Sequence, residues 1–325
     1  MKVVLAYWGV VLIWSTTPLG IATSNNGLTF WSAAGMRMLL AFALVAVIIA
    51  VRRQPFLPNR RVALAYLVAS LGLSPQMSLV YWAAQHVPTG VISLVFAFNP
   101  CLTALVSLMV IRGTKLSSRQ VFALLLAVVG MAIIYLDQLN FGREAALGIA
   151  ALFLSTAIFA VCSVWLKRLT TDLTLDPFCQ TGGTLLFAMP VYFLIWLSFD
   201  GEIPQSIQTD AAVAIVYLAV LGSVGGFTLY FYILRHMNVI TVSLITLITP
   251  VIALAIGTVF LNEPFTVQLA IGSGTVLLSL LLFEGMGIRF LRRVVDRKAI
   301  AVEQGALRTV SLSNVGPAKG GITKG

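Results

Sequence analysis

The chain has 325 residues, of which 59% are hydrophobic and 10% are charged, and its net charge is +10. A soluble protein of this length would need more charged residues on its surface. The composition therefore indicates a polytopic membrane protein. The positive charge does not indicate nucleic-acid binding, because Lys and Arg lie between apolar runs and in the tail rather than in a stripe with aromatic residues. Cys101, Cys162 and Cys179 show no CxxC spacing, so we expect no disulfide framework, metal site or cofactor.

Ten apolar runs predict ten membrane-spanning helices and an all-α fold. Runs of about 20 residues, rising about 1.5 Å per residue, cross a hydrocarbon layer of about 30 Å. The first run follows Lys2 as in a signal peptide, but no cleavage site of small residues follows it, so we expect a retained helix. The predicted spans are residues 3–23, 29–51, 62–84, 88–111, 118–136, 146–166, 177–199, 211–234, 239–261 and 266–287.

The distribution of basic residues predicts the orientation. If the N-terminus is cytoplasmic, every Lys and Arg except Arg37 and Arg143 falls on the inner side or in the C-terminal tail. Cytoplasmic loops carry an excess of Lys and Arg, so we expect both termini in the cytoplasm. We expect the basic tail, residues 288–325, to be disordered, with its first part on anionic lipid.

The fourth and ninth spans indicate an internal duplication. They match without a gap at an offset of 150 residues, which pairs Pro100 with Pro250 and the two histidines of the chain, His86 with His236. A mid-span proline removes a backbone hydrogen bond, so we expect both helices to kink or open there and to serve as hinges. Because each half has five spans, the second half would enter the membrane with opposite polarity, as an inverted repeat.

Arg37 is the one charge predicted to lie well inside a span. Intramembrane ionisable residues usually face the bundle interior and mark function, which makes Arg37 a candidate for binding a solute. A structural alternative is that its side chain reaches back to the outer interface, or binds backbone carbonyls exposed at kinked helices. The spans contain no deep Asp or Glu, which disfavours a proton-coupled exporter of cations.

Polar and aromatic residues on the kinked spans are the remaining candidates for a solute pathway. Ser243, Thr246 and Thr249 share a face with Pro250, where small residues also favour close helix packing, so both interpretations stay open. The aromatic candidates would act as stacking surfaces. The full set of candidates is Trp14, Arg37, Gln76, Tyr81, Asn99, Thr103, Tyr232, Ser243, Thr246 and Thr249.

The residues from Pro250 to Ser279 resemble the end of a repeat in the EamA-like family of the drug/metabolite transporter superfamily. The resemblance rests on Pro250, the pair Glu263-Pro264, and Gly272 with Gly274; the first half is similar through Arg37 and Pro100. The chain departs from the family at residues 112–115, where an acidic residue is common, and at Ser15, where glycine is common. The resemblance implies two inverted five-helix repeats, residues 1–137 and 146–287, around a central cavity.

The resemblance also implies alternating access and, usually, export of small organic metabolites such as amino acids. We therefore expect an exporter of an amino acid-like zwitterion or anion in the plasma membrane, which is the inner membrane in a bacterium. Its partners would be the solute and the lipid bilayer, and a homodimer stays open. The alternatives are a drug efflux carrier of broad specificity, a sensor or scaffold, and a membrane-embedded enzyme, for which no HExxH, GxSxG or paired intramembrane Asp is present.

Overall fold

The computed structural model describes residues 2–24, 27–53, 59–83, 85–87, 92, 95–135, 143–173, 175–201, 204, 206–260 and 266–284. The tail at 288–325, the Glu263-Pro264 pair and Ser93 lie outside these residues. Residues 1–280 form one compact unit. Every regular element within the described residues is helical.

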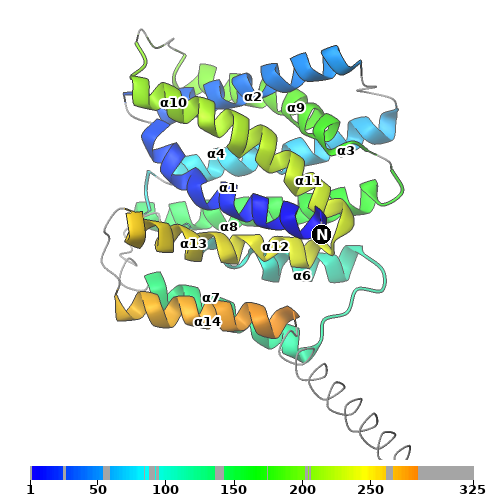
Figure 1. The fold of residues 1–325 in the computed structure, drawn as a ribbon, viewed down its shortest axis with the longest axis vertical. Helices are drawn as coiled ribbons and strands as arrows, with labels where there is room; N and C mark the ends of the chain where they lie inside the picture. Colours follow the sequence, from blue (N-terminus) through cyan, green and yellow to red (C-terminus); the bar gives the residue numbers. More distant parts are fainter. Residues whose placement is uncertain are drawn as a thin grey trace, which may run out of the picture. The chain divides into compact units, whose positions relative to one another are not determined.

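The helices follow the predicted spans closely (Figure 1). In the first half they are α1 (Lys2–Ser24), α2 (Phe30–Arg52), α3 (Arg60–Leu71), α4 (Ser74–Ala83), α6 (Asn99–Val110) and α7 (Ser118–Tyr135). In the second half they are α8 (Arg143–Thr170), α9 (Pro177–Phe199), α10 (Thr209–Tyr217), the π-helix η2 (Leu218–Gly225), α11 (Gly226–His236), α12 (Val239–Ser243), α13 (Ile245–Phe260) and α14 (Val267–Glu284).

Within the part of the chain that the structure describes, six helical stretches are long and apolar enough to cross a membrane, and four further apolar helices are shorter. Many large apolar side chains point away from the protein, such as Val51 and Met109, which are 78% and 80% exposed. Such an apolar exterior suits lipid and not water. The prediction of an all-helical membrane protein with about ten apolar segments is confirmed.

Two predicted spans differ from continuous α-helices. The span at 62–84 divides between α3 and α4. At the division, Gly72 packs closely against Cys162, where a Cβ would collide. Pro75 lies in the first turn of α4. The span at 211–234 contains η2, whose backbone bonds reach one residue further than in an α-helix. Both departures lie in the third span of their half, at residues where glycine lowers the preference for α-helix.

The spans that contain Pro100 and Pro250 are also interrupted, whereas α9 is unbroken at Pro190. In the first half α6 begins at Asn99, so Pro100 lies in its first turn. Backbone N–H groups in the first turn make no hydrogen bond within the helix, so the N–H that proline lacks is not needed there. In the second half the break falls at Leu244, between α12 and α13, and Pro250 lies six residues further on, inside α13. The interruption therefore precedes each proline instead of centring on it.

Small residues and one carboxylate hold neighbouring helices together. Figure 1 shows α7 and α14 side by side, where a Cβ on Gly130 would lie 2.9 Å from the carbonyl oxygen of Gly272. At one end of α2, the Asp200 carboxylate that follows α9 accepts hydrogen bonds from Thr29 at 2.5 Å and from Ser32. This carboxylate joins α2 to α9 and stabilises the first turn of α2.

Candidate functional site

Arg37 lies inside the bundle and not at its lipid-facing surface. It is 3% exposed and lies about 10 Å along α2 by helical rise. Its Nε donates to Ser223 Oγ of η2 at 2.9 Å, and a Cβ on Gly222 would approach its Nη2 to 3.1 Å. The side chain therefore points into the bundle and not toward its exterior.

Two buried polar groups on the neighbouring helices α2 and α9 have no hydrogen-bond partner among the described residues. They are Arg37 Nη1 and the hydroxyl of Tyr192 on α9, which is 5% exposed. Tyr81 of α4, another predicted candidate, is also buried. An unpaired donor buried in a protein costs about 1–3 kcal/mol, and more when it is charged, so this cluster has hydrogen-bonding capacity available for a polar ligand.

A second polar row runs along α6. Asn99, Thr103 and Ser107 recur every four residues and are each at most 1% exposed. Thr103 donates to Asn99 Oδ1 at 3.3 Å, while Asn99 Nδ2 and Ser107 Oγ have no partner among the described residues, and neither has Ser155 Oγ on α8. Because α6 packs against α8 and α12, this row lies between the two halves of the chain.

Trp14 belongs to an aromatic cluster between α1, α8 and α11. Its ring stacks on Tyr230 at a centroid distance of 5.4 Å, and a Cβ on Gly226 would lie 2.6 Å from its Nε1. The Tyr230 hydroxyl shares a hydrogen bond with Ser163 Oγ at 2.8 Å, and Phe159 packs on the other side at 5.9 Å. This cluster offers aromatic faces and a hydroxyl inside the bundle.

The other predicted candidates lie at several places in the bundle. Tyr232 packs against His236 at the end of α11. The hydroxyls of Ser243 and Thr246 donate to backbone carbonyls of their own segment at 2.7 and 2.8 Å. Gln76 is buried in α4, and Thr249 is half-buried in α13. Of the two spans that contain Pro100 and Pro250, the first holds two unpaired polar groups among the described residues, those of Asn99 and Ser107.

A cavity of about 330 Å³ lies where α6 and α8 end and α12 begins. Its wall includes Ser107, the last member of the α6 row, and three cationic residues that the sequence did not single out, Arg112, Lys167 and Arg168. The missed signal was a charge pattern: basic residues follow two apolar runs that the fold places side by side. The described residues thus combine a buried cation, hydroxyl and amide groups, and aromatic faces, which suits reversible binding of a small polar molecule.

Comparison with known proteins shows the family of the chain. Residues 1–136 and 146–284 each match the model of the EamA-like transporter family. The chain is 24% identical over 293 residues to protein PagO of Salmonella typhimurium, covering 87% of this chain and 91% of that protein. It is 25% identical over 272 residues to a probable terminal-alkyne amino-acid exporter of Streptantibioticus cattleyicolor, covering 81% and 88%.

The uncharacterized inner membrane transporter YedA of Escherichia coli is 24% identical over 258 residues, with 78% of this chain and 81% of that protein covered. Among solved structures, one crystal structure is similar with a TM-score of 0.71 at 17% sequence identity. The match covers 89% of this chain and 98% of that one. At that identity the likeness shows a shared fold alone.

Proposed function

The chain belongs to the EamA-like transporter family, and from this premise we propose that it exports a small organic metabolite that carries a carboxylate, by alternating access. The solute class would be an amino acid-like zwitterion or an organic anion. The observation that carries this proposal is Arg37, buried inside the bundle with Nη1 unpaired. In a medium of low dielectric constant, its charge attracts a carboxylate far more strongly than it would in water.

The charges of the interior support the same solute class. Among the residues that the structure describes, Arg37 is the only buried charged side chain. A cationic drug would meet repulsion there and no neighbouring carboxylate, which disfavours a carrier of cationic drugs. The S. cattleyicolor relative is described as a probable amino-acid exporter, which supports an amino acid-like solute here.

Alternating access would use the two halves as inverted repeats, residues 1–137 and 146–287, with both termini in the cytoplasm. The two family matches support this division. Aromatic–histidine pairs at the 150-residue offset also support it: Trp82 packs on His86 at 4.7 Å, and Tyr232 packs on His236 at 4.4 Å. We place the protein in the plasma membrane, the inner membrane in a bacterium, as YedA is described.

The test is transport by the purified chain in proteoliposomes. Radiolabelled alanine, glutamate, the diamine putrescine, which has no carboxylate, and lactamide, a neutral amide, are loaded inside or outside and followed over time. We expect movement of alanine or glutamate and not of putrescine or lactamide. Movement of putrescine alone, or of lactamide as fast as alanine, would exclude a carboxylate-selective carrier.

Matched variants then assign the role of Arg37. Arg37→Gln and Arg37→Lys are reconstituted at equal amounts of folded protein. If Arg37 binds the solute, Gln should weaken affinity for the carboxylate solute by about tenfold or more, since a charge-assisted hydrogen bond contributes about 1.5–3 kcal/mol. Lys should retain part of that affinity, because it keeps the charge but loses the fork of donors. Unchanged affinity in both variants would leave Arg37 as a structural residue.

A further inference from the structure

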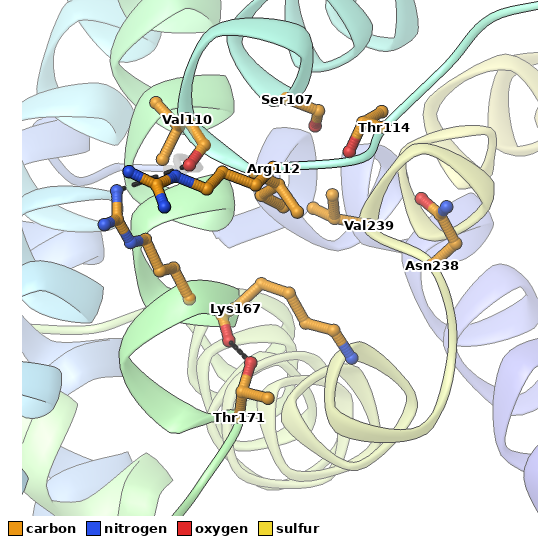
Figure 2. A pocket seen from close by; sticks show the side chains of 10 residues that line it. Ser107, Val110, Arg112, Thr114, Lys167, Thr171, Asn238 and Val239 are labelled. Atoms are coloured by element: carbon orange, nitrogen blue, oxygen red, sulfur yellow. Dashed lines mark hydrogen bonds between the residues drawn. The ribbon is translucent and has the colours of Figure 1, made fainter.

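The cavity between the ends of α6 and α8 has a strongly cationic wall. Arg112, Lys167 and Arg168 line it together with Thr114, Thr171 and Asn238, and no Asp or Glu is among the described residues of its lining. Asp172 follows Thr171 in the chain but is exposed and lies outside the wall. Figure 2 shows Arg112, Lys167, Thr114 and Asn238 around this space. At about 330 Å³, the cavity lies in the size range of small-ligand sites.

Two of the cations are held in place by helix ends. Lys167 Nζ donates to the carbonyls of Leu234 and Arg235 at 2.7 and 2.8 Å, at the C-terminal end of α11. Arg168 Nη1 donates to the Val110 carbonyl at 3.3 Å, at the end of α6. An ammonium has three donors and a guanidinium five, so both side chains keep donors for a ligand after capping these carbonyls. Arg112 is exposed at the mouth of the cavity.

Apolar side chains are exposed on the outer surfaces of the same two helices. On α6, Leu105, Leu108 and Met109 share one face and are 56%, 45% and 80% exposed. On α8, Val161 and Trp165 are 39% and 44% exposed, and the Arg168 guanidinium lies over the Trp165 ring at 5.7 Å. An aromatic ring beside a cation at a helix end is typical of the boundary between lipid tails and headgroups.

We propose that this cavity binds the phosphate of an anionic phospholipid, whose acyl chains lie on the exposed faces of α6 and α8. A free anion would use the cations but not the apolar faces, and a neutral lipid would use the apolar faces but gain little from the cations. The combination of both features at one place favours the anionic lipid. The bound lipid would contact α6 from the first half and α8 and α12 from the second.

The test is native mass spectrometry of the full chain in detergent, titrated with dioleoylphosphatidylglycerol or dioleoylphosphatidylcholine. We expect one phosphatidylglycerol to bind at least several-fold more tightly than phosphatidylcholine. Arg112→Gln should weaken its binding several-fold, because Arg112 lines the cavity and caps no described helix. The matched control is Arg61→Gln, which removes an exposed Arg at the start of α3, outside the cavity. Equal losses in both variants would show attraction to the overall positive charge and would overturn the site.

A second pair of measurements separates a lipid from a soluble anion. Met109→Gln changes the apolar face and leaves the cations, so it should weaken phosphatidylglycerol binding. Inorganic phosphate and glycerol 3-phosphate should compete poorly with the lipid. If either competes as well as a lipid does, or if Met109→Gln has no effect, the cavity serves a soluble anion and the lipid assignment is wrong. Since Arg112 and Met109 are both exposed, neither change removes core packing.

Discussion

The guanidinium of Arg37 and the hydroxyl of Ser223 meet 2.9 Å apart, in a bundle interior where Ser223 is completely buried. Ser223 also donates weakly to Met38 Sδ at 3.8 Å, which leaves its oxygen lone pairs turned toward Arg37. A cation from the first half of the chain is therefore oriented by the π-helical segment of the second. That orientation leaves Nη1 as the donor without a partner among the described residues.

Ser223→Ala should distinguish the effect of the orientation of the Arg37 side chain from the effect of its charge. The substitution leaves the charge of Arg37 intact but removes one acceptor, so we expect a loss of stability of about 1–3 kcal/mol. If Arg37 binds the solute, affinity should fall less than in Arg37→Gln, because the cation remains. Thermal unfolding in detergent and transport at equal folded amounts measure the two effects. A loss of affinity as large as that of Arg37→Gln would show that orientation, and not charge alone, determines binding.

Gly226→Ala should disrupt the aromatic cluster. The new methyl would lie 2.6 Å from Trp14 Nε1, so Trp14 must leave its stack on Tyr230. We expect lower thermal stability and a changed tryptophan emission spectrum. Gly274→Ala in α14 is the control, since a Cβ there meets no atom within 4 Å and Ala favours helix. If both variants behave like the parent protein, the contact with Trp14 does not constrain this cluster.

Pro100→Ala and Pro250→Ala test the proposed hinges. Pro100→Ala restores a backbone donor at the start of α6 and allows that helix to extend toward the interruption before it, and Pro250→Ala allows a backbone hydrogen bond to Thr246 inside α13. We expect transport to fall several-fold while the amount of folded protein in the membrane stays close to that of the parent, because a stiffer span hinders alternating access. Full transport activity in both variants would show that neither proline acts as a hinge.

Two serine-to-cysteine changes test the orientation. Ser206 and Ser118 are exposed, at connections predicted to lie outside and inside the membrane, respectively. In a background without the native cysteines, an impermeant maleimide applied to intact cells should modify the cysteine at position 206 and not the one at position 118. Lysis before labelling should make both reactive, which checks that each site is accessible. Labelling of position 118 alone in intact cells would reverse the predicted topology.

The apolar runs predicted most of the helices, because length and hydropathy determine which segments can cross a membrane. They could not predict the break at Gly72 or the π-helix at residues 218–225, since an interrupted span and a regular one have the same composition. Those features depend on close contacts across the fold, such as Gly72 against Cys162. The buried position of Arg37 was predictable from its depth in the span, but its partner Ser223, 186 residues away, was not.

The eighth span contains an aromatic face that its periodicity indicates. Phe227, Tyr230, Phe231 and Leu234 have the spacing of one helical face, and the predicted stacking residue Tyr232 does not share it. All four are buried in α11, and Tyr232 lies away from them. Basic residues at the ends of α6 and α8 were used to predict orientation, but their meeting in one cavity depends on how the two halves pack.

The π-helix of residues 218–225 also determines how far α11 is rotated about its axis relative to α10. A π turn holds about one more residue than an α turn, so rewinding this segment as α-helix would rotate α11 by roughly 100° about its axis relative to α10. Tyr230 and Phe227 would then leave Trp14, and Ser223 would turn away from Arg37. Deleting a single residue within the segment would remove that extra residue. The result would be a continuous α-helix in which α10 and α11 keep their present rotation relative to one another. The aromatic cluster and the buried cation thus share one backbone irregularity, which makes a change in helical winding a route for moving both together.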